Sequence, residues 1–341
     1  RYLRRGGRNV LMEKTDLRET VSFKAAVLVI LAAAVVFAFI LGNVVGTMDI
    51  SVSDIIDTVS GNHTGTNNKV IWNIRLPRMI LAALVGINLA LSGSILQGVM
   101  KNPLADPSII GISSGAGLFG IVILVIFPQW QNFVPIAAFG GAMLAAAIIY
   151  LLAWKGGIDP TRIVLSGVAV SELFGAGISA TLVFFSDRVH GALTFMNGSL
   201  SSRSWSEVRT ILPYTIAGLL LAFIFADKLN ILVLGDDTAR GLGLNVELTR
   251  LGFTALAALL AASAVSVVGL LGFVGLIVPH SIRLILGNNY RIMFPATALL
   301  GAALVMLSDT FARTVLSPTE IPVGIVMAVL GVPFFLYLLR K

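Results

Sequence analysis

A short glycine- and serine-rich stretch is the first place in this sequence where side chains could perform covalent chemistry. The G-x-S-x-G pattern of serine hydrolases is matched by Gly111-Ile112-Ser113-Ser114-Gly115, and His280 could act as the general base. That pattern supports catalysis only on a sharp strand-to-helix turn with an oxyanion hole. Here it opens a long uncharged run, where small residues allow helices to pack closely. An intramembrane serine hydrolase is therefore an alternative that the pattern does not favour.

The other residue types that carry chemistry are absent or dispersed. The three histidines, His63, His190 and His280, lie on separate segments without the spacing of metal ligands, and the chain contains no cysteine. It also lacks the phosphate-binding sequence G-x-x-x-x-G-K-[ST], so any ATP hydrolysis has to occur in a partner. We therefore predict no catalytic residue, no metal site and no cofactor in this chain.

Glu172 is the ionisable residue nearest to the middle of any long apolar run. A buried carboxylate is costly in a membrane unless it is protonated, paired or placed in a wet cavity, so a functional role is the default interpretation. Two interpretations stay open. Glu172 either faces a transport path or is a protonated carboxyl group bonded to a neighbouring helix.

Composition places these residues in a membrane protein. Of the 341 residues, 57% are hydrophobic and 12% are charged, whereas a soluble domain has about 25% charged residues. A basic tail at 1–24 precedes a single transmembrane domain at 25–341. Ten runs are long enough to cross a hydrocarbon core of roughly 30 Å. They lie at 25–48, at 79–100, twice within 107–154 around a break at 128–132, at 163–185, at 210–226, twice within 251–282, at 294–312 and at 321–339.

The distribution of basic residues predicts the orientation of these spans. The net charge is +7, but the basic residues are spread over loops and tails rather than gathered in a nucleic-acid-binding stripe. With ten spans, 17 of the 24 Lys and Arg residues fall on the side of the termini. The positive-inside rule makes that side cytoplasmic. The other seven are Lys69, Arg75, Arg78, Arg188, Arg203, Arg209 and Arg313.

Residues 75–117 form the most informative stretch. Two arginines, Arg75 and Arg78, lead into an uncharged helix that carries a polar stripe. A helix that faces lipid would not carry such a stripe, so we expect it to pack on protein or to line a path. Pro103 and Pro107 then prevent the helix from continuing. The stripe consists of Asn88, Ser92, Ser94 and Gln97.

Several motifs in this stretch and beyond it resemble one family. They are Arg-Leu-Pro-Arg at 75–78, Asn-Pro-Leu-Ala-Asp-Pro at 102–107, GISSGAG at 111–117, GDDTARGLGL at 235–244, GFVGLIVPH at 272–280 and EIPVG at 320–324. Together they are similar to the permease subunits of ATP-driven (ABC, type II) importers for iron-siderophores, haem and vitamin B12. The resemblance covers nearly the whole chain in order.

The resemblance implies an all-α permease of about ten transmembrane helices in a bacterial cell membrane. It implies a second permease subunit (the same chain or a similar one), two ATP-binding subunits and an extracytoplasmic binding protein. Outer segments at 198–199 and 203–205 are more similar to siderophore permeases than to the vitamin B12 type, so the expected cargo is an iron(III)-siderophore. Haem or cobalamin is the alternative cargo. An ion-coupled secondary transporter, which needs no ATPase, is the alternative of another class.

The resemblance also assigns roles to residues. The substrate path and its gate are expected at Asn88, Gln97, Asn102, Leu104, Thr161 and Glu172. The ATPase-coupling loop is expected at 227–249, where Asp236 or Asp237 could N-cap a short helix that ends at Gly241 or Gly243. By composition alone that helix would be an ordinary solvated one. The coupling residues are expected to be Gly235, Asp236, Asp237, Ala239, Arg240, Gly241 and Gly243.

Three outward arginines complete the expected site. In the family, matching arginines receive acidic residues of the binding protein, which assigns docking to Arg75, Arg78 and Arg313. Arginine suits the bidentate recognition of carboxylates. The alternative is that Arg75 and Arg78 only anchor a helix in the lipid headgroups, while Arg313 pairs with Asp309 four residues earlier.

Overall fold

The computed structural model describes residues 21–46, 48, 50–61, 65–108, 111–154 and 160–340. The first twenty residues of the basic tail and His63 lie outside this described part. The last residues of the predicted tail are already helical, because the first helix, α1, begins at Val21.

The predicted spans correspond to ten apolar helices in the described part of the chain. Seven are long and apolar enough to cross a membrane by length and composition, and α5, α12 and α14 are shorter. The ten are α1 (Val21–Val44), α4 (Leu76–Val99), α5 (Ile112–Ile126), α6 (Val134–Ala153), α7 (Pro160–Phe184), α9 (Trp205–Val233), α11 (Val246–Val268), α12 (Val274–Leu286), α13 (Tyr290–Thr314) and α14 (Val323–Leu339). The all-α membrane fold is therefore confirmed.

Short helices fill the connections. One of them, α2, begins with a reciprocal capping box between Ser51 and Asp54. A π-helical turn, η2, leads directly into α4. The short elements are α2 (Val52–Val59), α3 (Thr66–Val70), η2 (Ile71–Arg75), η3 (Pro128–Phe133), η4 (Ser186–Arg188), α8 (Val189–Met196) and α10 (Asp236–Gly241).

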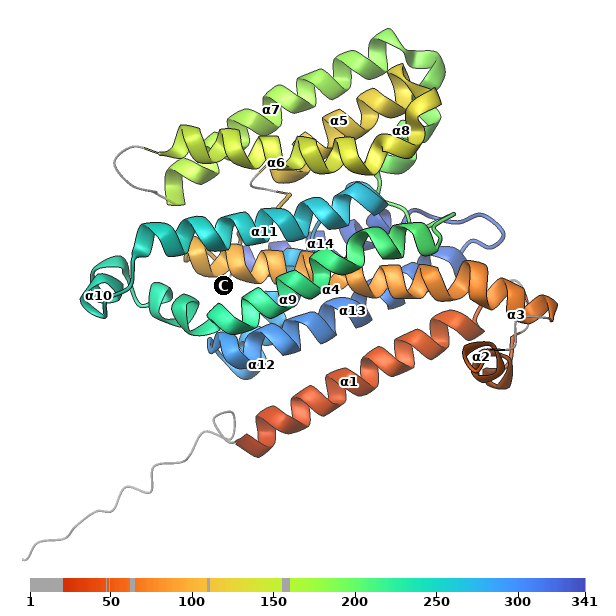
Figure 1. The fold of residues 1–341 in the computed structure, drawn as a ribbon, viewed down its shortest axis with the longest axis horizontal. Coiled ribbons are helices and arrows are strands. Elements are labelled where there is room, and N and C mark those ends of the chain that lie inside the picture. Colours follow the sequence, from red (N-terminus) through yellow and green to blue (C-terminus); the bar gives the residue numbers. More distant parts are fainter. Residues whose placement is uncertain are drawn as a thin grey trace, which may run out of the picture.

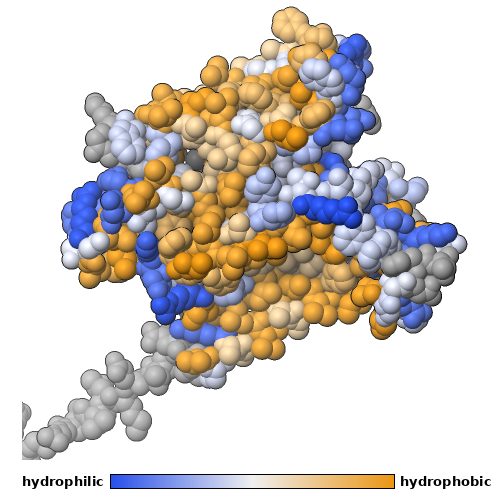
Figure 2. Space-filling view, in the orientation of Figure 1, coloured by the Kyte–Doolittle hydropathy of each residue, from blue (hydrophilic) through white to orange (hydrophobic). Residues whose placement is uncertain are grey.

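The two ends of the molecule differ in what they contain. The start of α1, the helix α10 and the C-terminal end of the chain lie toward one end, and α2, α3 and α8 lie toward the other (Figure 1). Hydrophobic side chains cover the surface between these ends, and hydrophilic side chains gather at the ends themselves (Figure 2). This distribution is what a bilayer requires of a bundle that spans it.

Helix α4 lies at the centre of the bundle, and nearly all of its residues are buried. It packs against α13, α11, α9 and α12 (Figure 1). Two glycine pairs bring backbones into direct contact, since a Cβ on Gly86 would lie 2.1 Å from the carbonyl oxygen of Gly301, and one on Gly93 would lie 2.0 Å from that of Gly275. Small residues permit this close approach between membrane helices.

Two boundaries are informative. The uncharged run at 251–282 does bend into two helices, because α11 ends at Val268 and Gly269 adopts a positive φ of 82°. The predicted coupling loop at 227–249 is shorter than expected, since α9 continues to Val233 and α11 already begins at Val246.

We expect the substitution Gly86→Ala to destabilise the bundle. The added methyl group would overlap the backbone of Gly301 on α13, and overpacking of this kind costs about 1–3 kcal/mol or more. A lower Tm of the purified protein in detergent is the measurement. Gly140→Ala on α6 is the matched control, because a Cβ there meets no atom within 4 Å. Equal Tm values for the two variants would contradict the proposed contact.

Candidate functional site

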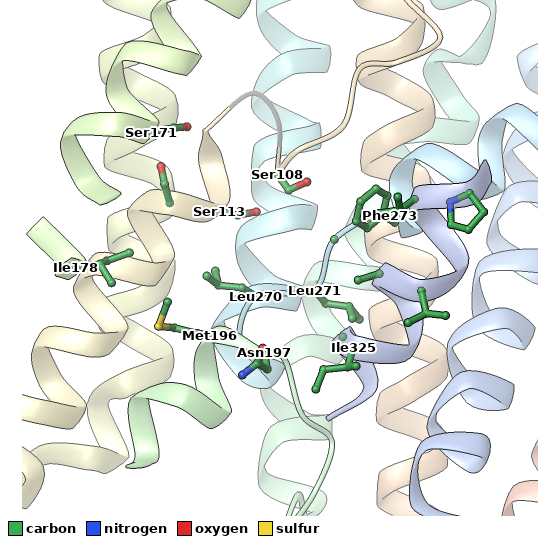
Figure 3. A pocket seen from close by; sticks show the side chains of 17 residues that line it. Ser108, Ser113, Ser171, Ile178, Met196, Asn197, Leu270, Leu271, Phe273 and Ile325 are labelled. Atoms are coloured by element: carbon green, nitrogen blue, oxygen red, sulfur yellow. The ribbon is translucent and has the colours of Figure 1, made fainter. Parts of the chain in front are cut away.

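A groove of about 840 Å³ opens on one side of the bundle. The turn before α5, the helices α5, α7 and α14, the end of α8 and the linker before α12 all contribute to its walls (Figure 3). Its lining residues include Ser108, Ser113, Ser114, Ser171, Ile178, Met196, Asn197, Leu270, Phe273, Gly324, Ile325 and Ala328.

The groove is apolar with hydroxyl groups at one end. Ser108, Ser113 and Ser171 lie together there, and Asn197 lies toward the other end (Figure 3). None of the described residues that line it carries a formal charge. A concave, mainly apolar surface with a few polar groups is typical of a small-molecule site.

Phe273, in the wall of this groove, has an unusual backbone conformation. Its φ is 68°, in the left-handed region, and it immediately precedes α12. Bulky residues rarely adopt this conformation, and strain of about 1–3 kcal/mol persists only where the surroundings enforce it. Gly331 on α14 makes room for the ring, because a Cβ there would lie 2.2 Å from Cγ of Phe273. Phe273 could not be identified from its sequence position, because a positive φ at a non-glycine residue leaves no local sequence signal.

The serine-hydrolase alternative does not fit this geometry. Described residues before α5 form a helix and turns rather than a strand, and Ser113 and Ser114 lie in the first turn of α5. The hydroxyl of Ser114 donates to the carbonyl of Gly111 at 2.7 Å. His280 packs edge-on against the ring of Phe334, with centroids 5.9 Å apart. The required strand-to-helix turn is therefore missing from this part of the chain.

Glu172 and Thr161 lie on the exposed face of α7. The side chain of Glu172 is on the outer surface of the bundle, beside the groove-lining Ser171, rather than buried against a neighbouring helix of the same chain. The bonded, buried interpretation of Glu172 is thus wrong for the isolated chain. A role of Glu172 and Thr161 in a path stays a prediction.

Asn88 and Gln97 do not line a path in this conformation. The side-chain amide of Asn88 is fully buried and donates to Oγ of Ser263 on α11 at 2.9 Å. That of Gln97 is also buried and donates to the carbonyl of Gly275 on α12 at 3.2 Å. The expectation that these two contact cargo is corrected, because the stripe packs α4 on its neighbours.

The turn at residues 101–108 connects α4 to the region of the groove. Asn102 is exposed, Leu104 is half-buried, and the backbone N–H of Leu104 donates to Oδ1 of Asn102 at 2.9 Å. This bond and the two prolines hold the turn in shape. The turn lies at the end of the bundle that is predicted to be cytoplasmic. This position suits a gate, which stays a prediction.

The outer arginines have partners within the chain. Arg75 is 5% exposed and donates to the carbonyls of Asn43, Val44 and Met48 at 2.5, 3.0 and 2.9 Å. Arg313 donates to the carbonyl of Gly42. Both therefore satisfy carbonyl groups at the end of α1 that no helical N–H can reach, and their charge suits a helix C-terminus.

Arg78 forms the central ion pair of this outer cluster. It binds both carboxylate oxygens of Asp309 at 2.8 and 2.9 Å, and its third nitrogen binds Glu320 at 3.0–3.1 Å. The alternative in which Arg313 pairs with Asp309 is corrected, since the carboxylate of Asp309 binds Arg78 instead. Arg75 and Arg78 are buried, so the expectation that they offer free charges for docking is corrected for this conformation.

The short helix predicted within residues 227–249 is present as α10, but it starts differently from the prediction, and its role in ATPase coupling stays a prediction. Gly235 precedes it with a φ of 118° and no side-chain cap, so neither Asp236 nor Asp237 is the N-cap. The helix ends at Gly241, and Gly243 follows with a φ of 82°. Ala239 is fully buried, which makes it a packing residue rather than a surface for docking. Asp237, Arg240, Gly241 and Gly243 are exposed.

Comparison with known proteins matches residues 33–341 to the FecCD transport family. The Fe(3+)-citrate import system permease protein YfmD of Bacillus subtilis (strain 168) is 38% identical, over 91% of this chain and 93% of its own. The hemin transport system permease protein HmuU of Yersinia pestis is 42% identical, over 82% and 86%. A solved structure described as an inward-facing metal-chelate type ABC transporter gives a TM-score of 0.83 at 28% identity, over 93% of this chain and 99% of that one.

We expect Asp309→Asn to destabilise the outer end of the bundle strongly. The substitution leaves the buried charge of Arg78 without its main partner, and breaking a buried pair costs about 3–5 kcal/mol. Unfolding in detergent measures this loss. Glu320→Gln is the control at the same arginine, because the side chain of Glu320 is 39% exposed and pairs at such sites contribute about 0–1 kcal/mol. The prediction fails if Glu320→Gln is the more damaging change.

Proposed function

The chain belongs to the FecCD transport family, and we propose that it is the permease subunit of an ATP-driven importer. The match over residues 33–341, together with the likeness to a transporter of metal-chelate type, supports this proposal. In this role the chain performs no chemistry. It forms a membrane path whose access alternates as partner subunits bind and hydrolyse ATP.

The groove between α7 and α14 forms one wall of that path. It is open along one side, and the exposed carboxylate of Glu172 lies on the same helix, α7, near its middle. Exposure of a carboxylate to lipid at this depth is unfavourable. We therefore propose that a second permease subunit, identical or similar, faces α7 and α14 and encloses a path between the two grooves.

The partners attach at the two ends of the bundle. Two ATP-binding subunits dock at the end that carries α10, where exposed polar and charged residues surround a buried Ala239. An extracytoplasmic binding protein docks at the other end, above the arginine cluster. Arg313 is the half-buried member of the expected docking set and stays a candidate for direct contact. The assembly lies in the cell membrane of a bacterium.

We propose an iron(III)-siderophore as the cargo. The relatives' names include import systems for Fe(3+)-citrate, iron(3+)-hydroxamate, hemin and cobalamin. The groove's serine hydroxyls and apolar walls carry no formal charge, which suits a chelate whose iron is already wrapped in organic ligand. A neutral iron(III) trihydroxamate is therefore the first compound to test.

The test is uptake by proteoliposomes that contain this permease with its ATP-binding subunits. Iron(III) trihydroxamate labelled with radioactive iron is added with the binding protein, and ATP is enclosed with the ATP-binding subunits. Uptake that requires ATP and stops with a hydrolysis-deficient ATPase supports the proposal. Uptake that instead follows a proton gradient and needs no ATPase would replace it with a secondary transporter.

We expect Ala328→Trp to reduce uptake in this assay to background. Ala328 is a small residue of the groove wall on α14, so an indole ring there fills the path without touching α10. Ala33→Trp is the matched control, since Ala33 is an exposed alanine of α1, outside the groove lining. Both variants should retain the ATP-binding subunits through purification. Normal uptake by Ala328→Trp would show that the path lies elsewhere.

A further inference from the structure

A carboxylate on α10 connects three elements at the cytoplasmic end of the bundle. Asp236 accepts a hydrogen bond from Nζ of Lys101 at 2.9 Å, and Lys101 begins the 101–108 turn. The same carboxylate accepts two bonds from Nη2 of Arg250, at 3.0 and 3.1 Å, and Arg250 belongs to the first turns of α11. The three side chains come from segments far apart in sequence.

The carboxylate of Asp236 is partly buried and ionised at neutral pH. The side chain of Arg250 is 2% exposed, so its buried charge requires a nearby carboxylate such as that of Asp236. Partial burial opposes ionisation of Asp236, but hydrogen bonds from Lys101 and Arg250 hold its pKa below the ordinary value of 3.8. Asp236 is therefore negatively charged throughout the physiological range.

The backbone at Lys101 supports a role for its side chain. Helix α4 ends in a Schellman motif, because the N–H of Lys101 donates to the carbonyl of Gly98 and that of Asn102 donates to the carbonyl of Gln97. Lys101 occupies the position of this motif that glycine normally fills, with a φ of 50°. A lysine there is strained relative to glycine, and the contact with Asp236 gives a physical reason for it.

The 101–108 turn leads from this contact to the groove. It contains the predicted gate residues Asn102 and Leu104, and Ser108 at its other end lines the groove (Figure 3). A displacement of α10 would therefore pull on Lys101 at one end of the turn, while the two prolines limit how far the turn can absorb the movement.

We propose that Asp236 is a positioning residue that links α10 to the gate through Lys101 and to α11 through Arg250. This inference rests on the proposed function, because it assumes that the ATP-binding subunits move α10. It assigns different roles to two adjacent carboxylates. Asp237 is fully exposed on the proposed docking surface and pairs with Arg240 on the same short helix at 3.8 Å. Asp236 instead binds side chains outside α10 and transmits movement.

The experiment measures cargo delivered per ATP hydrolysed in the proteoliposome assay with labelled iron(III) trihydroxamate. Lys101→Gln removes the link to the turn and leaves the pair of Asp236 with Arg250 intact. We expect this ratio to fall by about five-fold or more, the scale of a typical coupling free energy, while the ATP-binding subunits still co-purify and hydrolyse ATP. Lys101→Arg, which keeps the charge and a hydrogen-bond donor, should retain the ratio of the wild type.

Lys101→Gly separates the link from the stability of the turn. Glycine fits the backbone at this position better than lysine, so the turn is not weakened by strain in this variant. We expect the same loss of coupling as in Lys101→Gln, without a lower Tm. Asp236→Asn should show this loss too, and combining it with Lys101→Gln should add little, because both substitutions break one contact.

The control carries the same change of charge as Lys101→Gln at another lysine. Lys228→Gln, at an exposed lysine that lies over the ring of Phe225, should keep the wild-type ratio. Wild-type coupling in both Lys101→Gln and Lys101→Gly, or an equal loss in Lys228→Gln, would overturn this inference alone. A wild-type permease that binds no ATP-binding subunits would overturn the proposed function and the inference with it.

Discussion

The enclosure of α4 by protein on nearly all sides is the constraint on which the rest of the structure depends. Its backbone touches α13 at Gly86 and α12 at Gly93, and no side chain larger than hydrogen fits at either contact. Because little lipid or water reaches this helix, a polar side chain on it gains from a partner on a surrounding helix. Asn88 and Gln97 find such partners on α11 and α12. These two residues of the polar stripe are thus packing residues in this conformation, and the groove is lined by other helices, including α7 and α14.

Hydropathy was sufficient to predict the helices, because a bilayer forces each apolar run of adequate length into one. It also divided the uncharged run at 251–282 into two helices. Hydropathy could not identify the partners of polar side chains. The polar stripe of α4 was compatible with two interpretations, a transport path and a packed interior. Only the positions of α11 and α12 in the structure distinguish these interpretations.

The charged residues show the same limit more clearly. Helical spacing suggested that Asp309 pairs with Arg313, yet its partner is Arg78, 231 positions away in the sequence. Similarly, Asp236 lies where an N-cap would be expected but binds Lys101 and Arg250 instead. In both cases the carboxylate binds a buried arginine rather than the partner that local spacing suggests. The reason is that a buried arginine without a carboxylate costs more free energy than a lost surface pair or an uncapped helix end. Local pattern therefore located these residues without giving their roles.

The positions of the two ionic clusters give α4 a further role. Arg75 and Arg78 stand at its outer end, bound to α1 and α13, and Lys101 follows its cytoplasmic end, bound to α10. Between them the helix is held by backbone contacts that leave little freedom to slide or bend. A rigid element fixed at both ends transmits displacement better than a flexible one. The most buried of the long apolar helices in the described part of the chain is consequently the one best placed to connect the two ends of the bundle.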